Sequence, residues 1–276
     1  MMDIYYENSK GDRLNLLEQP YCLQTADIFD KSWAYSSVST RRNRERIDGF
    51  TKEVESKRLV LSVIGKTPRQ YQDALNRFQE VTEYDVLKAS PGRLWAGDYY
   101  LPCYVLSSIK AEWEYDIDRL DNEIEIISDY PFWCRERPFS FRAGADVPEG
   151  FLDYPYDHAY DYAPPSNMRF LHNDHYYDCD FKCTVYGPCE DPRFMVDDHV
   201  YEVRALLYDH EHLTFDSRDK SLVKTDYQGR RSNIFNSRNK EHDLFCKIPP
   251  GRSSITWNLG FGFDITLFQE RSEPRW

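Results

Sequence analysis

Almost every periodic stretch of this chain alternates with the period of a β-strand, and only one stretch has the period of a helix. Residues 59–64 form an apolar run rich in β-branched side chains, closed by Gly65, which predicts a buried strand. In the second half, short strands are predicted at residues 181–186, 199–208, 212–215, 221–225, 253–258 and 262–268. Many short strands with almost no helical pattern predict a mainly β protein whose second half is a β-sandwich of jelly-roll type.

The one helical segment is predicted at about residues 68–84. Thr67 offers an N-cap hydroxyl, Pro68 suits the first helical position, and Gln70 is placed to complete a capping box. Apolar residues recur at helical spacing along it, at Tyr71, Ala74, Leu75, Phe78 and Val81. The first half is therefore expected to be a β-sandwich-like domain with one packed helix.

The length of 276 residues favours two domains. The strand pattern of the first half is interrupted at Arg135-Glu136-Arg137-Pro138, and a loop-rich tract follows at residues 150–165. We therefore predict an N-terminal domain at residues 1–137 and a C-terminal domain at residues 138–276.

The composition excludes several function classes. A net charge of −12 opposes a sequence-independent grip on nucleic acid, which requires clustered Lys and Arg in excess. No run of about 18 apolar residues occurs, and the N-terminus lacks the pattern of a signal peptide, so we expect a soluble product made in the cytoplasm without membrane insertion. The seven cysteines are odd in number and scattered, which predicts free, mostly buried thiols rather than a disulfide framework.

Motifs of common enzyme classes are also missing from the sequence. It contains no Walker A motif, no G-x-S-x-G elbow, no H-E-x-x-H and no dinucleotide fingerprint. We therefore predict no catalytic residues, no cofactor and no metal, and take the protein to be no enzyme.

Several ordered motifs carry a family resemblance. In the first half the strand and capped helix are followed by Gly92-Arg93-Leu94-Trp95-Ala96-Gly97-Asp98-Tyr99-Tyr100, a strand, an alternating hairpin and Phe132-Trp133. The second half contains Tyr186-Gly187-Pro188-Cys189-Glu190-Asp191-Pro192, Val200-Tyr201, Leu213-Thr214-Phe215-Asp216 with Lys220, and a run from Ile248-Pro249-Pro250-Gly251 through Trp257 to Arg271-Ser272-Glu273-Pro274-Arg275-Trp276. In this order they resemble the distal tail (Dit) proteins of siphophages over nearly the whole chain.

The resemblance implies a structural, non-enzymatic component of a phage tail tip. N-terminal domains would form a homo-hexameric ring that joins the tail tube protein to the baseplate hub, and galectin-like C-terminal domains would project toward receptor-binding or other baseplate proteins. Such a protein would be assembled in the host bacterial cytoplasm and reside in the virion, and DNA would pass through the ring without specific binding. A carbohydrate-binding β-sandwich that contributes to host attachment is the alternative.

An acidic alternating segment surrounds the four residues 119–122, and its pattern predicts a hairpin. In simple register Asp118 would face Glu123 and Asp116 would face Glu125, which is destabilising unless something compensates. In the ring such a face could line a lumen, or meet a basic strip on a neighbour formed by Arg41, Arg42, Arg44 and Arg46. An ordinary solvated strand face is the alternative. The candidate residues of this acidic face are Glu112, Glu114, Asp116, Asp118, Glu123 and Glu125.

The spacing of His172, His175, Cys179 and Cys183 invites a zinc site, because imidazole and thiolate are zinc's usual ligands. Alternation offers a different interpretation, in which both cysteines point to one apolar face as small core residues. We favour the core interpretation.

The loop at residues 154–162 mixes aromatic rings with carboxylates. Sugar-binding loops have this composition, but Tyr is also enriched at protein interfaces. We favour an outer interface loop, whose candidate residues are Tyr154, Tyr156, Tyr160 and Tyr162.

Overall fold

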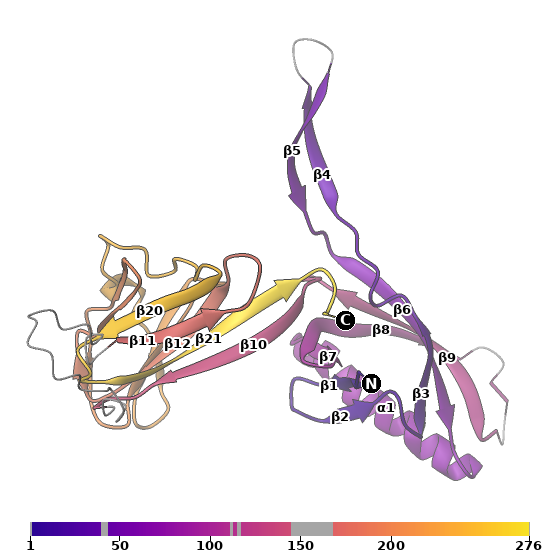
Figure 1. Ribbon diagram of the computed structural model, residues 1–276. Helices are drawn as coiled ribbons and strands as arrows, with labels where there is room; N and C mark the ends of the chain where they lie inside the picture. Colours follow the sequence, from indigo (N-terminus) through magenta and orange to yellow (C-terminus); the bar gives the residue numbers. More distant parts are fainter. Residues whose placement is uncertain (1, 40–43, 111–112, 115–116, 145–167, 276) are drawn as a thin grey trace, which may run out of the picture. The chain divides into compact units, whose positions relative to one another are not determined.

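The computed structural model describes residues 2–39, 44–110, 113–114, 117–144 and 168–275 (Figure 1). Backbone contacts group the chain into unit 1, Met1–Arg135 with Glu270–Trp276, and unit 2, Glu136–Gln269. The sequence predicted a division after residue 137, with residues 270–276 in the second domain. In the structure, residues 270–276 group with unit 1 instead.

Two strands, β10 (Trp133–Phe141) and β21 (Gly262–Arg271), carry the chain from one unit into the other. The predicted interruption at residues 135–138 was therefore wrong, because these residues lie inside β10. Residues 136–138 are all exposed, so their polar run reflects solvent on both sides of the strand rather than its end.

Unit 1 contains one α-helix, α1 (Pro68–Lys88), among its described residues. Its other strands are β1 (Ile4–Glu7), β2 (Arg13–Asn15), β3 (Tyr21–Ala26), β4 (Ala34–Ser39), β5 (Glu45–Thr51), β6 (Glu55–Ile64), β7 (Gly92–Ala96), β8 (Tyr99–Ile109) and β9 (Arg119–Ser128).

The long strand β8 joins two antiparallel ladders of unit 1. Its first half pairs with β7, with Gly92 opposite Cys103, and its second half pairs with β9, with Tyr104 opposite Ile127. The strand orders are β2–β1–β7–β8 and β8–β9–β6–β3, and α1 packs against β2, β6 and β8. Tyr71, Ala74, Phe78 and Val81 of α1 are buried and belong to the core of unit 1.

The predicted helix start is confirmed. Thr67 Oγ1 accepts a hydrogen bond from Gln70 N at 3.3 Å, and Gln70 Oε1 accepts one from Lys66 N at 3.0 Å. The helix runs four residues past the predicted end at residue 84, and its last turn contains Asp85, which is fully buried. Tyr6 Oη donates to Asp85 Oδ2 at 2.5 Å and Ser9 N donates to Asp85 Oδ1 at 2.7 Å, so the buried carboxylate has donors on both oxygens.

Unit 2 contains the short 3₁₀ helix η1 (Phe235–Ser237). Its strands besides β10 and β21 are β11 (Met168–Asn173), β12 (Asp180–Tyr186), β13 (Cys189–Glu190), β14 (Arg193–Val196), β15 (His199–Glu202), β16 (Leu206–Leu207), β17 (His212–Asp216), β18 (Ser221–Thr225), β19 (Arg231–Asn233) and β20 (Gly251–Trp257).

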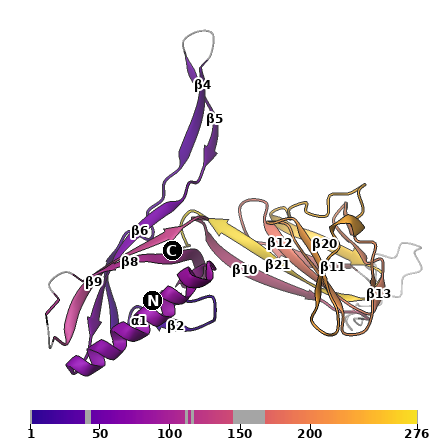
Figure 2. The same cartoon turned by 180° about the vertical axis from the view of Figure 1, so that it is seen from behind.

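Unit 2 contains two larger antiparallel sheets that form a sandwich (Figure 2) and the short two-stranded sheet β13–β16. One sheet has the order β19–β18–β17–β12–β21–β10 and the other has the order β11–β20–β14–β15. Alternate residues of both sheets form one buried cluster, in which the ring of Phe194 stacks 4.5 Å from that of Phe263 and Phe181 meets Tyr201 edge-on at 5.4 Å. The predicted mainly β fold is confirmed.

The predicted strand at residues 199–208 was only partly right. Residues 203–205 separate β15 from β16. The predicted turn at Pro249-Pro250-Gly251 fits the structure, since Gly251 has φ +102°, close to what the third position of a type II turn requires. In the described part of the chain, α1 is too polar to serve as a bilayer-spanning segment, and no other helix reaches the length required.

Candidate functional site

The sheet β8–β9–β6–β3 has one face covered by α1 and one open face. Leu61 and Val63 of β6 and Ile124 and Ile126 of β9 point to the covered side and are buried. Their alternate neighbours point the other way, because successive residues of a strand face opposite sides of the sheet. On β9 these neighbours are Arg119, Asp121, Glu123, Glu125 and Ile127.

The open face does not contain the predicted hairpin. Residues 119–122, expected to be its turn, lie inside β9, and β9 pairs with β8 and β6 instead of with residues 113–118. The prediction was wrong because period-2 alternation identifies a strand but not its partner. The segment that joins β8 to β9 contains Glu114 and Asp118, both exposed, while Glu112 and Asp116 lie outside the described residues.

The observed pairing removes the predicted clash of like charges. Glu125 lies between Arg58 of β6 and Ser107 of β8, and its carboxylate accepts a hydrogen bond from Ser56 Oγ. Asp121 accepts a hydrogen bond from Ser62 Oγ of β6. The open face therefore mixes three carboxylates with Arg58 and Arg119.

Glu123 differs from the other two carboxylates of the open face. Its directly opposite neighbours, Val60 on β6 and Ile109 on β8, are both apolar. The side chain is exposed, so solvent rather than a cross-strand partner stabilises its charge. Among the carboxylates of the open face, Glu123 is therefore the one most available to interact electrostatically with a molecule outside the sheet.

A second surface, the arm, is the two-stranded sheet β4–β5, which extends away from the rest of unit 1 (Figures 1 and 2). Tyr35 and Phe50 lie opposite each other on it and are 66% and 63% exposed. Val38 and Ile47 are also more than half exposed. Large apolar side chains gathered on a projecting hairpin form an interaction surface rather than part of the core.

Sequence analysis did not predict the arm, because residues 34–51 combine β-prone residues with serines and charges and show no sustained alternation. The basic run was the available signal, since its described part leads into β5. Arg46 lies on β5 opposite Val38 and Arg44 directly precedes β5, while Arg41 and Arg42 lie outside the described residues.

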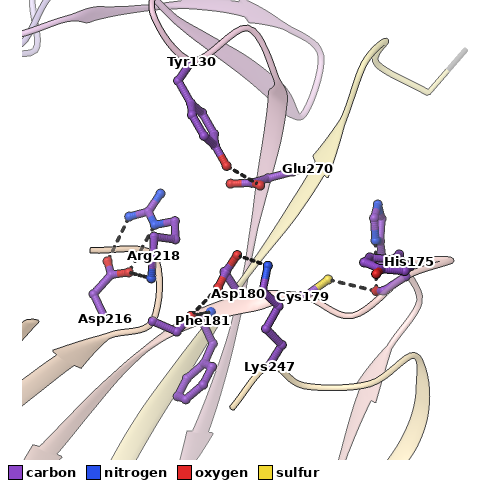
Figure 3. Close-up of polar contacts among 11 residues, drawn as sticks. Tyr130, His175, Cys179, Asp180, Phe181, Asp216, Arg218, Lys247 and Glu270 are labelled. Carbon is purple, nitrogen blue, oxygen red and sulfur yellow. Dashed lines mark hydrogen bonds and ion pairs between the residues drawn. The ribbon is translucent and has the colours of Figure 1, made fainter. Parts of the chain in front are cut away.

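Of the candidate zinc ligands in unit 2, Cys179 and Cys183 are buried on one face with Phe181 and Val185, as the core interpretation predicted. Burial raises the pKa of the Cys183 thiol well above its usual value, which disfavours the thiolate that zinc needs. Cys179 contacts Asn173 Oδ1 at 3.4 Å, and the His175 ring contacts the Tyr177 carbonyl (Figure 3). Within the described residues, no three His, Cys, Asp or Glu side chains are grouped to hold a metal.

The other predicted surface of unit 2 is the loop with Tyr154, Tyr156, Tyr160 and Tyr162. All four lie outside the described residues. Their predicted role at an outer interface therefore stays a prediction.

Comparisons with known proteins give a likeness in structure only. No protein-family model matches the sequence, and no curated protein matches it either. Among solved structures, the Dit protein of phage SPP1, described as a paradigm of the hub adsorption apparatus in phages infecting Gram-positive bacteria, is 7% identical with a TM-score of 0.63, and the match covers 98% of this chain and 99% of that one.

Chains of the phage P2 baseplate in its activated conformation match equally well. The chain from the structure with Ca is 9% identical, with a TM-score of 0.62 over 99% of both chains. The chain from the structure with Sr is 10% identical, with a TM-score of 0.63 over 99% of this chain and 100% of the baseplate chain. At such identities the sequences share little beyond what the fold requires. From end to end, the chain has the fold of phage distal tail and baseplate hub proteins, which confirms the resemblance that its ordered motifs indicated.

Proposed function

We propose that this chain is a structural, non-catalytic distal tail protein of a phage tail tip. Copies of unit 1 assemble into a hexameric ring that joins the tail tube to the baseplate and receptor-binding apparatus. The observation that carries the proposal is the likeness to a Dit hub protein over 98% of this chain, which includes both units.

The arm supports self-association. Its exposed Tyr35, Val38, Ile47 and Phe50 belong to neither buried cluster, so isolated unit 1 leaves them in water. Covering them would remove apolar surface from water, which is the main driving force for association. In a homo-oligomeric ring every subunit has identical neighbours, so another copy of the chain is available to cover the arm of each subunit.

The open face supports the idea of a lumen wall. One side of β8–β9–β6–β3 is packed by α1, and the other carries Asp121, Glu123 and Glu125 among basic and apolar residues such as Arg58 and Val60. In the proposed ring this surface faces the axis, and carboxylates there would keep passing DNA from adhering through its phosphates.

In this proposal unit 2 is the galectin-like module, which carries contacts to baseplate or receptor-binding proteins. Its two-sheet sandwich gives it a core separate from that of unit 1. No catalytic role is assigned to either unit.

The test is the assembly state of the purified full chain, measured by mass photometry and negative-stain electron microscopy. We expect a particle of six copies with six-fold symmetry around an open axis. A chain that remains monomeric at micromolar concentration contradicts the ring. Retention of such a monomer on a glycan column would favour the carbohydrate-binding alternative.

A further inference from the structure

A groove of about 450 Å³, the α1–β8 groove, lies between α1 and the second half of β8 in unit 1. Besides polar side chains without charge, its lining has one charge of each sign, Glu83 and Lys110. Glu83 accepts a hydrogen bond from Gln79 and Lys110 donates one to Ser108, both at 3.3 Å. The groove is therefore electrically balanced. Its apolar lining residues are Leu75, Phe78, Val86, Val105 and Leu106.

Two side chains of the α1–β8 groove leave apolar surface in water. Val86 of α1 is 49% exposed and Leu106 of β8 is 58% exposed. Leu106 is the extra residue of a β-bulge, because Val105 and Ser107 pair with successive residues of β9 and Leu106 pairs with neither of them. The bulge thus leaves a leucine side chain at the edge of the groove rather than in the core.

The exposed apolar side chains of unit 1 gather in two places. Among its described residues, every large apolar side chain that is more than half exposed belongs to one of two groups. One group comprises the arm and the residues just after it, and the other comprises α1, β8 and the segment after β8. Association would cover such surface. The first group is Tyr35, Val38, Ile47, Phe50 and Val54, and the second is Leu87, Leu106, Ile109 and Trp113.

One face of the arm matches the α1–β8 groove in chemical character. Directly opposite residues, and residues two apart on one strand, share a face of a sheet. Glu45 is the only charged residue among the described residues of this face, and Lys110 of the groove has the opposite charge. The other members of the face are apolar or carry hydroxyls, as the groove does. The face consists of the opposite pairs Tyr35 and Phe50, Ser37 and Ile47, and Ser39 and Glu45.

The arm and the groove of one chain do not cover each other. In both views the arm extends away from α1 (Figures 1 and 2), and no described arm residue belongs to the core of unit 1. A projecting surface and a recessed surface at different places on one chain form a heterologous contact, which closes into a ring when every copy repeats it. A second copy is therefore the partner that suits both surfaces.

We propose that the arm of one copy docks in the α1–β8 groove of a second copy, with the face that carries Tyr35 and Phe50 against the exposed side chains of Val86 and Leu106. The inference rests on the proposed self-association and assigns the surface that receives the arm. A different segment of the second copy could also cover the arm, and the experiments separate these cases.

The first experiment identifies what the arm contacts. Tyr35 is replaced by the photoreactive analogue p-benzoyl-phenylalanine, and unlabelled and ¹⁵N-labelled chains are dissociated, mixed, reassembled and irradiated. We expect cross-links from position 35 to peptides of α1 or β8, including mixed-isotope species. Assembled particles with mixed-isotope cross-links only to other segments, with cross-links only within one isotope, or with none would overturn this inference while leaving the ring intact. A chain that does not self-associate overturns both.

The second experiment tests the groove. Leu106→Asp places a carboxylate among its apolar side chains, so we expect self-association to weaken at least about tenfold. The melting temperature of the dilute chain should not change, because Leu106 lies outside the core cluster. Leu206→Asp, at an exposed leucine of unit 2, is the matched control and should change neither quantity. Unchanged self-association of Leu106→Asp would overturn the inference. If Leu106→Asp lowers the melting temperature, Val86→Asp on the α1 side of the groove gives the same test.

Discussion

Arg58 of β6 lies directly opposite Glu125 of β9 on the open face, an attractive pair where the sequence had indicated two facing carboxylates. Arg58→Glu would restore that repulsion, and we expect it to lower the free energy of unfolding by about 1 kcal/mol. Combining it with Glu125→Arg should recover most of the loss, because the swap returns opposite charges to the pair. Urea unfolding of the two variants and the wild type measures this. Equal destabilisation by the single and double variants would show that charge is not the cause.

The hydrogen bond from Tyr6 to the buried Asp85 links β1 to the last turn of α1. Tyr6→Phe removes the donor and leaves Oδ2 of a buried carboxylate without it, so we expect a loss of about 2–3 kcal/mol in unfolding free energy. Tyr5→Phe is the matched control, since the neighbouring Tyr5 stacks on Trp95 through its ring and should lose less than about 0.5 kcal/mol. Similar losses in both variants would contradict the assignment.

Stability at alkaline pH should depend on Tyr21. Burial raises the pKa of Tyr21 to about 12, and its hydroxyl donates to the Ala74 carbonyl at 2.8 Å. In the unfolded chain the same phenol ionises near pH 10, so its contribution is complete below pH 10 and is lost as the pH rises toward 12. Tyr21→Phe should lower the free energy of unfolding by about 1 kcal/mol at pH 7. Between pH 10 and 12 the unfolding free energy of this variant should fall less steeply than that of the wild type. Parallel pH profiles of both proteins would count against this.

The arm should matter for assembly and little for folding. Tyr35→Ser with Phe50→Ser removes two exposed rings that lie in neither core cluster, so we expect an unchanged melting temperature for the dilute chain. Self-association, measured by mass photometry, should weaken at least tenfold. Tyr227→Ser changes an equally exposed tyrosine of unit 2 and is expected to leave assembly unaffected. An arm variant that assembles normally would remove the arm from the interface.

If the open face lines a lumen, its charge should govern contact with DNA. Glu123→Lys exchanges a negative for a positive charge at a residue whose cross-strand neighbours are apolar, so the fold should tolerate it. We expect assembled particles of this variant to retain duplex DNA in low salt and release it in high salt, whereas wild-type particles retain none. Glu241→Lys, at an exposed glutamate of unit 2, controls for the change in net charge. If both variants retain DNA equally, net charge rather than the position of Glu123 explains the binding, and the lumen position of Glu123 is contradicted.

Local signals predicted local structure well. Thr67, Pro68 and Gln70 fixed the start of α1, and β18 was predicted with the bounds that the structure has. The end of α1 was missed because its final turn is stabilised by Tyr6 and Ser9, which lie more than 70 residues away in sequence and do not contribute to local helical periodicity. Alternation around Glu123 predicted a strand correctly, but its partner was wrong because pairing is decided by distant residues such as Val60.

Surfaces were less predictable than elements. The arm escaped notice because an exposed hairpin need not alternate, since neither of its faces is buried by its own chain. The contact of Lys52 with the rings of Trp33 and Phe132 could not be predicted either, because the three residues come from separate parts of the sequence. Only the order of motifs, from the strand at residues 59–64 and the capped helix through Trp276, indicated the fold as a whole.

Because β10 leaves unit 1 and β21 returns to it, residues 136–269 form an insertion whose two ends are both anchored in the same host unit. A single cleavage within that insertion gives an N-terminal and a C-terminal fragment, and each of them still contains residues of unit 1. The arrangement also makes the inserted module a replaceable cassette. A different β-sandwich could be spliced between Arg135 and Glu270 while the chain termini and the arm keep their places in the host unit.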